Sequence, residues 1–312
     1  MRIKDKIKRP RRPVVAYEIL PPREKDGTLN SYAANISSLL SQTHIDAINI
    51  PEVRDEVARG ERPIKSQLRA EPREFGRLLQ DIIGIEAIVN RVVVHQELEK
   101  EIEWFEETHS RYEVENMIIV GGESRSIKYP GPSVNQALSA INKSQKLELL
   151  CGGISIPSRD KESLRLIEKS EHGSEFFTTQ VLYDHSKIIK MISHYQKRCN
   201  EKNTFPRRIL LSFAPVSSKK NIKFLKWLGV EFPREIEYEL TKDLKTMSEK
   251  SMEIAVQVLE KILNFLNENK IVVPIGLNVE HIMSYNFQAS IEMLQELSRI
   301  YREFCIKTDI YN

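Results

Sequence analysis

The chain of 312 residues contains only three cysteines. Cys151, Cys199 and Cys305 lie far apart, and no two of them form a Cys-x-x-Cys pair. An odd number of widely spaced thiols does not build a disulfide framework and suits a reducing compartment. We therefore expect a cytoplasmic protein in which none of the three cysteines is a metal ligand.

Long apolar runs and an excess of one charge are also missing. No stretch approaches the roughly 20 apolar residues that span a bilayer. Lys and Arg number 47 against 44 Asp and Glu, a net charge of +3, so neither a membrane nor a nucleic acid is an expected partner. No His-x-His pair or Asp/His cluster suggests a metal.

Residues 1–13 (MRIKDKIKRPRRP) carry seven basic side chains but no apolar segment of the kind found in a signal peptide. We interpret them as a solvated basic arm. Contact with an anionic ligand, a membrane or a nucleic acid is the alternative for this segment.

The rest of the chain repeats one pattern, in which short β-branched runs alternate with polar stretches that have apolar residues every three or four positions. Near-continuous apolar runs are typical of parallel strands, and the polar stretches predict the helices that cover them. Eight such units in one domain predict an α/β fold, a single (β/α)8 TIM barrel, with a doubly wound open sheet as the alternative. The predicted strands are 14–19, 45–50, 85–94, 116–122, 148–156, 175–183, 208–216 and 272–279.

No Pro-, Gly- or Ser-rich linker divides the chain, so residues 14–312 are expected to form one catalytic domain. Helices are predicted over 98–109 and over 163–173, the second ending on a glycine, which commonly terminates helices. The segment 246–268 has an apolar stripe that should face the core. The helix predicted over 288–304 should complete the outer ring.

Polar residues stand where the predicted strands end. In a TIM barrel the active site lies at the carboxyl ends of the strands, so these residues are candidates for the site. Gln180 is the most unexpected, because it interrupts the strand-like segment EFFTTQVLYD (175–184). Some of them can equally be strand-end caps or members of internal ion pairs. The others are Glu18, Asn49, Asn90, Glu123, Arg159, Ser217, Ser218, Asn278 and Glu280.

Two motifs carry a resemblance to a known family. YEILPPR (17–23) places a glutamate among apolar residues before a Pro-Pro stop, and TTQ (178–180) ends the sixth predicted strand. Together they resemble methylenetetrahydrofolate reductase, whose first strand carries Phe-Glu-Phe-Phe-Pro-Pro and whose sixth carries Thr-Gln. IVGGES (119–124), EKSEHGSEFFTTQVLYD (168–184) and APVSSKKNIKFLKWLGVEFP (214–233) are similar to further parts of that family. The segments IPSR and LNVE resemble its smaller, divergent members.

The resemblance implies an oxidoreductase that reduces 5,10-methylene-tetrahydrofolate, or a related methylene-pterin, to the 5-methyl form. The hydride would come from NAD(P)H, either through FAD in a flavoprotein or directly, as some divergent members are thought to do. Such an enzyme serves one-carbon metabolism and methionine biosynthesis. Its partner is a small folate or pterin, and assembly with itself or with a partner subunit stays open.

The resemblance also implies roles for residues of the site. Glu18 is the candidate catalytic acid, because burial raises the pKa of a carboxyl group and lets it protonate N10 of the substrate near pH 7. An ion pair with Arg23 is the structural alternative. Gln180 offers a donor and an acceptor to pterin and nicotinamide, or else only a strand-end hydrogen bond. Asn49 and Glu123, the latter in place of the family's aspartate, are candidate substrate contacts.

Five residues are candidate cofactor contacts by the same resemblance. Arg159 could bind a phosphate or the glutamate tail, and Lys169 could pair with a cofactor phosphate. A solvated or ion-paired arginine and a solvated helix lysine are the alternatives. Asn90, Gly121 and Gly122 lie where the family approaches flavin. The stretches 90–93 and 152–159 both depart from the family's usual flavin-contacting sequences.

Two other functions are alternatives to the reductase. A non-catalytic barrel subunit that binds pterin is the first. An aldolase-type barrel is the second, and it is disfavoured because it needs a Schiff-base lysine in a strand and none of the eight predicted strands contains lysine.

Overall fold

The computed structural model describes residues 1–54, 60–65, 67–124, 126–144 and 146–311. Its eight strands are parallel and close into a barrel in chain order, with β8 pairing back onto β1. This confirms the predicted (β/α)8 barrel, and each predicted run overlaps one observed strand. The strands are β1 (Val15–Glu18), β2 (Ala47–Ile50), β3 (Ala87–Val92), β4 (Asn116–Val120), β5 (Leu150–Ser155), β6 (Phe176–Thr179), β7 (Arg208–Phe213) and β8 (Ile275–Glu280).

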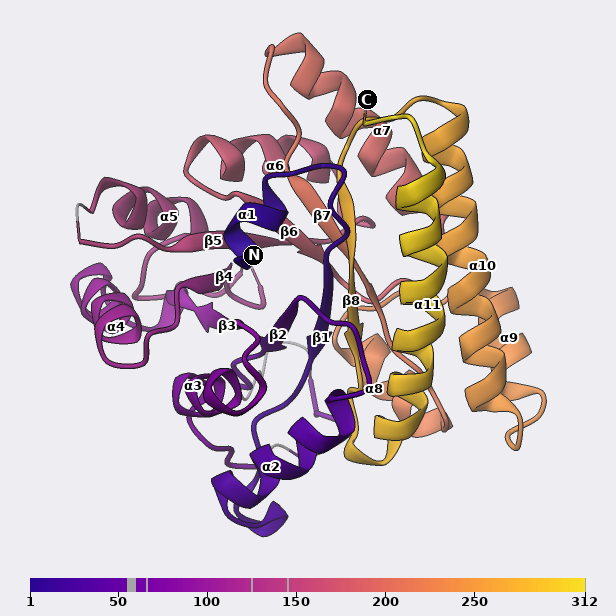
Figure 1. Cartoon of the computed structure of the whole chain (residues 1–312), viewed down its shortest axis with the longest axis horizontal. Coiled ribbons are helices and arrows are strands. Elements are labelled where there is room, and N and C mark those ends of the chain that lie inside the picture. Colours follow the sequence, from indigo (N-terminus) through magenta and orange to yellow (C-terminus); the bar gives the residue numbers. More distant parts are fainter. Residues whose placement is uncertain (55–59, 66, 125, 145, 312) are drawn as a thin grey trace.

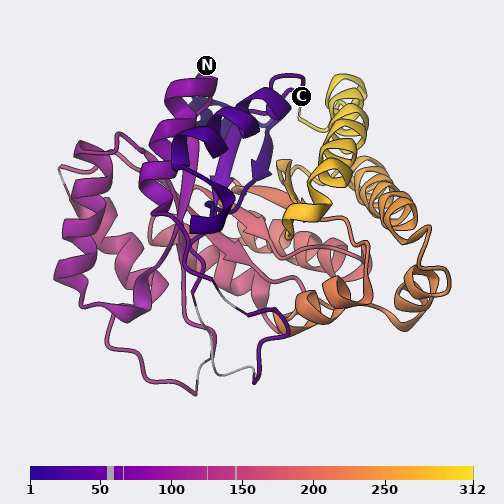
Figure 2. The same ribbon diagram turned by 90° about the horizontal axis from the view of Figure 1, so that it is seen from below.

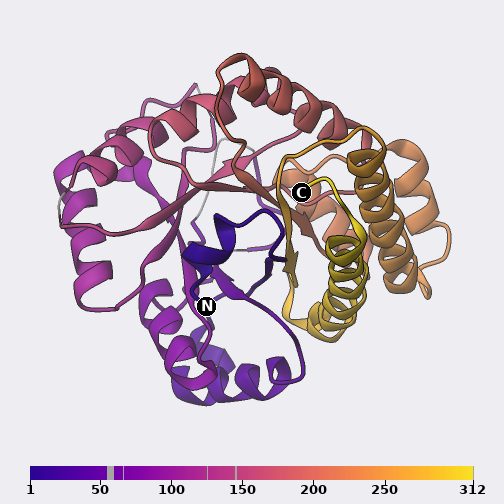
Figure 3. The ribbon, with the colours of Figure 1, turned by 45° about the horizontal axis from the view of Figure 1, so that its top comes forward.

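Helices surround the barrel (Figure 1), and the view in Figure 3 shows the ring they form around the strands. Three of them, α8 to α10, lie between β7 and β8. The α-helices are α1 (Ile3–Ile7), α2 (Leu29–Leu40), α3 (Pro72–Ile83), α4 (Leu98–Ser110), α5 (Val134–Lys143), α6 (Glu162–Glu171), α7 (Ser186–Glu201), α8 (Lys219–Trp227), α9 (Arg234–Thr241), α10 (Met247–Glu268) and α11 (Phe287–Lys307). Short 3₁₀ turns are η1 (Glu24–Asp26), η2 (Val93–His95) and η3 (Ser284–Asn286).

The helices predicted from apolar spacing are confirmed. The stripe expected on the segment 246–268 is buried along α10, α4 and α11 cover two other predicted ranges, and α6 covers the third as far as Glu171. Gly173 follows α6 with a φ of +116°, a conformation that residues with a side chain rarely adopt. None of the described helices has the length and apolar character needed to cross a membrane.

Small residues make room for large ones in the barrel interior. Phe176 is fully buried there, and a Cβ on Gly152 of the neighbouring strand would lie 2.5 Å from its ring. A Cβ on Gly276 would likewise lie 2.5 Å from Leu210. At both positions packing leaves no room for a larger residue. The barrel interior at the end where the strands begin is an apolar core.

The prediction of a solvated N-terminal arm is wrong for the first residues of the chain. Residues Ile3–Ile7 form α1, which lies across the centre of the strand ring in Figure 3. Ile3 and Ile7 are 1% and 3% exposed and join the core inside the barrel. Their spacing of four residues places both on one helix face, so α1 covers the end of the barrel where the strands begin.

A buried arginine holds this N-terminal segment. Arg208, at the start of β7, is 1% exposed and donates hydrogen bonds to the carbonyl oxygens of Ile7 (3.2 Å), Arg9 (2.7 Å) and Ile275. Figure 2 shows both chain ends on one side of the molecule, and Arg11 Nε donates to the Tyr311 carbonyl at 3.0 Å. The opposite end of the barrel, where the strands finish, is left for a site.

Candidate functional site

Alternation along the strands turns a set of polar side chains inward above the apolar core. Ala16, Ala47 and Phe176 belong to the interior core, so Glu18, Asn49 and Thr178, each two residues later, point the same way. Pairing places Glu18 beside Asn49 on one side and beside Glu280 on the other. The polar layer therefore brings together residues that the sequence only placed at the ends of separate strands.

Amide side chains connect this layer. Asn49 Nδ2 donates to Glu18 Oε2 at 2.7 Å and to Asn278 Oδ1 at 3.4 Å. Asn278 Nδ2 in turn donates to Ser212 Oγ at 3.0 Å and to Glu280 Oε1 at 3.1 Å. The two carboxyl groups are thus joined through two amides, which fix their orientation.

Burial controls the titration of the acids. It raises the pKa of Glu18 to about 7, and the asparagine amides beside the carboxyl group oppose that rise. Burial, followed by the charge of Glu18, raises the pKa of Glu280 well above its ordinary value. Burial also lowers the pKa of His281 to about 4, so this imidazole is neutral at pH 7. Arg23 pairs with Asp26 at 2.7 Å, so the alternative in which it neutralises Glu18 is not what the structure shows.

Glu18 and Glu280 line a cavity that we call the Glu18 cavity. It has a volume of about 300 Å³ and contains both carboxyl groups and His281. Phe224 and Trp227 of α8 form an aromatic wall. Five cationic side chains also line it: Arg23, Arg54, Arg62, Lys65 and Arg69. A planar ring with an anionic tail matches this combination of aromatic wall and basic lining.

Contacts between α8 and the segment after β2 close one side of the Glu18 cavity. Trp227 Nε1 donates to the Gly60 carbonyl at 3.2 Å. The Arg62 guanidinium lies 5.5 Å from the Phe224 ring centre and 5.4 Å from that of Trp227. Sequence reasoning missed this aromatic and cationic group. The signal available was the apolar face of KFLKWLGV, which by itself is equally typical of a core-facing helix.

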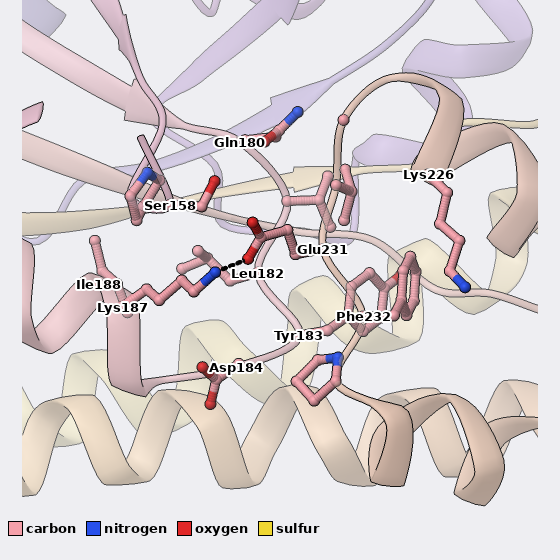
Figure 4. A pocket seen from close by; sticks show the side chains of 15 residues that line it. Ser158, Gln180, Leu182, Tyr183, Asp184, Lys187, Ile188, Lys226, Glu231 and Phe232 are labelled. Atoms are coloured by element: carbon pink, nitrogen blue, oxygen red, sulfur yellow. Dashed lines mark hydrogen bonds and ion pairs between the residues drawn. The ribbon is translucent and has the colours of Figure 1, made fainter. Parts of the chain in front are cut away.

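The second cavity, which we call the Gln180 cavity, is larger, about 640 Å³, and lies between the segments after β5, β6 and α8 (Figure 4). The Tyr183 and Phe232 rings stack in its wall with centres 4.2 Å apart. Lys187 and Glu231 form an ion pair beside them. Despite its size, this cavity is less suited to be the catalytic centre, because neither Glu18 nor Glu280 lines it.

Gln180 lies at the boundary between the two cavities. It lines the second cavity, and its Nε2 donates at 2.8 Å to the carbonyl of Leu228, which lines the first. Glu18 and Gln180 therefore line different cavities. The strand-end hydrogen bond considered as an alternative is present, and the catalytic role stays a prediction.

Glu123 lies in a turn after β4 that is built around Tyr129. The Glu123 N–H donates to the Tyr129 hydroxyl at 3.0 Å, and a Cβ on Gly122 would lie 2.3 Å from the Tyr129 ring. Neither of the two cavities includes Glu123 or Gly121 in its lining. The glycines at this turn thus have a packing reason, and the predicted pterin contact of Glu123 stays a prediction.

The other predicted cofactor contacts are dispersed. Lys169 is half-buried between α6 and β5, where its ammonium donates to the Ile154 carbonyl, and desolvation lowers its pKa to about 8. Arg159 lies 3.6 Å from the Glu162 carboxylate. Asn90 is 8% exposed, and its Oδ1 is buried without a hydrogen-bond partner. The five residues do not surround either cavity, so as placed they do not fit a bound flavin; FAD stays a prediction.

Of the strand-end residues, Ser218 fits the alternative of a structural cap, because its side chain accepts from the Asn221 N–H at the start of α8. Among the described residues, no cluster of three or more His, Cys, Asp or Glu side chains is placed to hold a metal ion.

A (β/α)8 barrel with buried acids at its strand ends is the class of protein that this geometry defines. Residues 152–298, from β5 into α11, match the profile of the methylenetetrahydrofolate reductase family, which confirms the resemblance over that range. Glu18 and Asn49 lie outside the matched residues. Among curated proteins, none matches the sequence significantly.

Solved structures share the fold. An uncharacterized protein from Clostridium thermocellum that binds two copies of 5-methyl-5,6,7,8-tetrahydrofolic acid is similar with a TM-score of 0.75 and 22% identity, over 92% of this chain and 95% of that one. A GH113 β-1,4-mannanase is similar with a TM-score of 0.51 and 8% identity, over 94% of this chain and 98% of that one. At these identities the likeness concerns architecture alone.

Proposed function

We propose that this protein reduces 5,10-methylene-tetrahydrofolate, or a related methylene-pterin, to the 5-methyl form with hydride from NAD(P)H. The observation that carries the proposal is Glu18, a carboxyl group whose pKa is raised to about 7 on the floor of a cavity with an aromatic wall. The family match over 152–298 and the similar protein that binds 5-methyl-tetrahydrofolic acid support it.

The reaction consumes one hydride and one proton and gives methyl-tetrahydrofolate and NAD(P)⁺. A proton on N10 allows the bond from N10 to the bridging carbon to break, which leaves that carbon double-bonded to a cationic N5. Hydride from the nicotinamide then adds to the carbon. Glu18 is the proposed proton donor, since a neutral carboxyl near pH 7 is an effective general acid.

The remaining polar groups would orient the reactants. Asn49 holds Glu18 Oε2, which leaves Oε1 for the donated proton. The Phe224 and Trp227 wall would stack on the pterin, and the cations that line the cavity would receive the carboxylates of its tail. Gln180 would contact the nicotinamide from the second cavity. Because Gln180 and Glu18 line different cavities, the segment after α8 would have to shift for the two rings to meet.

Direct transfer from the nicotinamide is the cofactor arrangement we favour over transfer through FAD. The predicted flavin contacts Asn90, Arg159 and Lys169 do not converge on one cavity. Flavin absorbs visible light strongly, so the absorption spectrum of purified protein tests this choice. A yellow protein with stoichiometric flavin would reverse it.

A pterin-binding subunit without catalysis is the second candidate. The aromatic and basic lining of the Glu18 cavity supports binding of such a ligand whether or not chemistry follows.

The test combines binding with turnover. We expect purified protein to oxidise NAD(P)H only when methylene-tetrahydrofolate is present. Glu18→Gln should keep pterin affinity but lower turnover by roughly 10²–10⁴-fold, because the amide cannot donate the required proton. Glu175→Gln is the matched control, since Glu175 pairs with Lys8 at the other end of the barrel. Binding without any oxidation would favour the non-catalytic subunit, and full turnover by Glu18→Gln would make Glu18 structural.

A further inference from the structure

Glu280 is an acidic strand-end residue to which the proposed reaction assigns no role. It ends β8 directly beside Glu18 of β1, in register. Gly276 and Asn278 point into the barrel, so Glu280 does as well. Both carboxyl groups then open into the same cavity.

Neutral amides, not cations, serve these two carboxyl groups. Asn49 donates to Glu18, Asn278 donates to Glu280, and Asn49 also donates to Asn278. Among the described residues no lysine or arginine forms an ion pair with either acid; Arg23 and Arg54, which line the same cavity, pair instead with Asp26 and Glu52. Two neighbouring, partly buried carboxylates without a cation repel each other, so one proton is retained between them.

We propose that Glu18 and Glu280 form a carboxyl pair that holds a shared proton, with Glu280 as the positioning residue that keeps Glu18 supplied with the proton it donates. This rests on the proposed reduction, because it assigns the source of that reaction's proton. In each turnover Glu18 gives one proton to N10, and the pair then takes one proton from solvent through the cavity. No redox partner beyond NAD(P)H is needed.

The other titratable groups around the pair leave this assignment intact. His281, next to Glu280 on the chain, is neutral because burial lowers its pKa to about 4. Tyr183, after β6, donates its hydroxyl to the Ala214 carbonyl, and the charge of Glu280 adds to the burial that raises its pKa. The charged groups that line the cavity on other segments are Arg23, Asp26, Glu52, Arg54, Arg62, Lys65 and Arg69, with Tyr32 on α2.

The first experiment is the pH profile of kcat/KM. In the wild type, loss of the last proton would leave two adjacent carboxylates that repel each other. The pair should therefore keep this proton, and the enzyme its activity, up to alkaline pH. Glu280→Gln removes that repulsion and should move the alkaline limb down by about one pH unit or more. Glu280→Asp should retain part of the wild-type limb, and Glu175→Gln should retain all of it. A uniform loss of rate with an unmoved limb would overturn the proposal.

The second experiment needs no activity. Carbon NMR of glutamate-labelled, ligand-free protein should show two coupled carboxyl titrations, assigned by their loss in Glu18→Gln and Glu280→Gln. Each variant should leave one carboxyl that titrates at lower pH than the last carboxyl of the wild type. Either variant suffices if the other does not fold. Coupled titrations in a protein without reductase activity would refute the reaction and keep the pair, whereas independent titrations in an active enzyme would refute the pair.

Discussion

Gln180 shows how much one side chain's role depends on its surroundings. It follows β6, and its backbone N–H continues the ladder by donating to the Ser155 carbonyl at 2.9 Å. Its side chain donates across to Leu228, between two cavities. The amide at this position thus bonds to the end of α8, and contact with a ligand stays a prediction.

Gln180→Leu separates these two roles. If the amide orients ligands, both the pterin and the nicotinamide should lose about 1–3 kcal/mol of binding or transition-state stabilisation, because polar atoms are left unpaired. Apparent affinities for both ligands and the thermal stability are measured together. Gln196→Leu does not serve as a control, because Gln196 accepts from the Val272 N–H; Gln288→Leu on the exposed face of α11 does. Unchanged kinetics would leave Gln180 with a structural role alone.

At the scale of elements, α1 is a short helix that is stable only through tertiary contacts. Five residues are too few for an isolated helix. Here the helix gains two buried isoleucines, an ion pair between Lys6 and Asp46, and the hydrogen bonds of Arg208 to the carbonyls that end the helix. Cationic donors at a helix C-terminus also interact favourably with the helix dipole.

Ile7→Ala tests the contribution of α1. Removing most of a buried isoleucine should lower the free energy of unfolding by about 2–5 kcal/mol, measured by urea denaturation. Asp5→Ala, on the exposed side of the same helix, should change it by less than about 0.5 kcal/mol. The site lies at the other end of the barrel, so kcat should be unchanged in folded protein. An equal, small effect of both substitutions would mean that α1 does not contribute to the core in solution.

For the whole molecule, the buried groups of the site link stability to pH. The folded pKa of Glu18 is raised to about 7 from an ordinary 4.5, so the folded state holds more protons than the unfolded state in this window. The stability that Glu18 contributes in this way is fully present below about pH 4.5 and is lost as pH rises through 7. His281 acts oppositely: its folded pKa of about 4 lies below 6.5, so its contribution is lost as pH falls between these values.

The contributions of Glu18 and His281 to the pH dependence of stability oppose each other below pH 6.5. Above pH 6.5 only the contribution of the carboxyl groups remains. We therefore expect wild-type stability to fall between pH 6.5 and 8. The double substitution Glu18→Gln and Glu280→Gln should flatten this fall, since the amides do not ionise. Denaturation midpoints at pH 5, 6.5 and 8 measure the effect. A fall of the same size in wild type and variant would place its origin in other groups.

The repeated apolar runs determined the barrel and the position of each strand, because strand and helix periodicities are local and leave the same trace in every unit. The flanking apolar residues of YEILPPR likewise predicted a buried acid at Glu18. The N-terminal segment could not be assigned in the same way. Its charges are local and visible, whereas the barrel end that buries Ile3 and Ile7 is formed by residues far along the chain.

Which strand-end residues act together was decided only by the tertiary structure. The closing of β8 onto β1 put Glu280 beside Glu18, whereas Gln180 lines a different cavity. The turn of Glu123 is bonded to Tyr129, and the ammonium of Lys169 donates to the Ile154 carbonyl, so both are occupied by local contacts. The sequence sets which face of a strand a residue occupies, but strand register and the packing of long connections arise from contacts distant in the chain, and these contacts assemble the site.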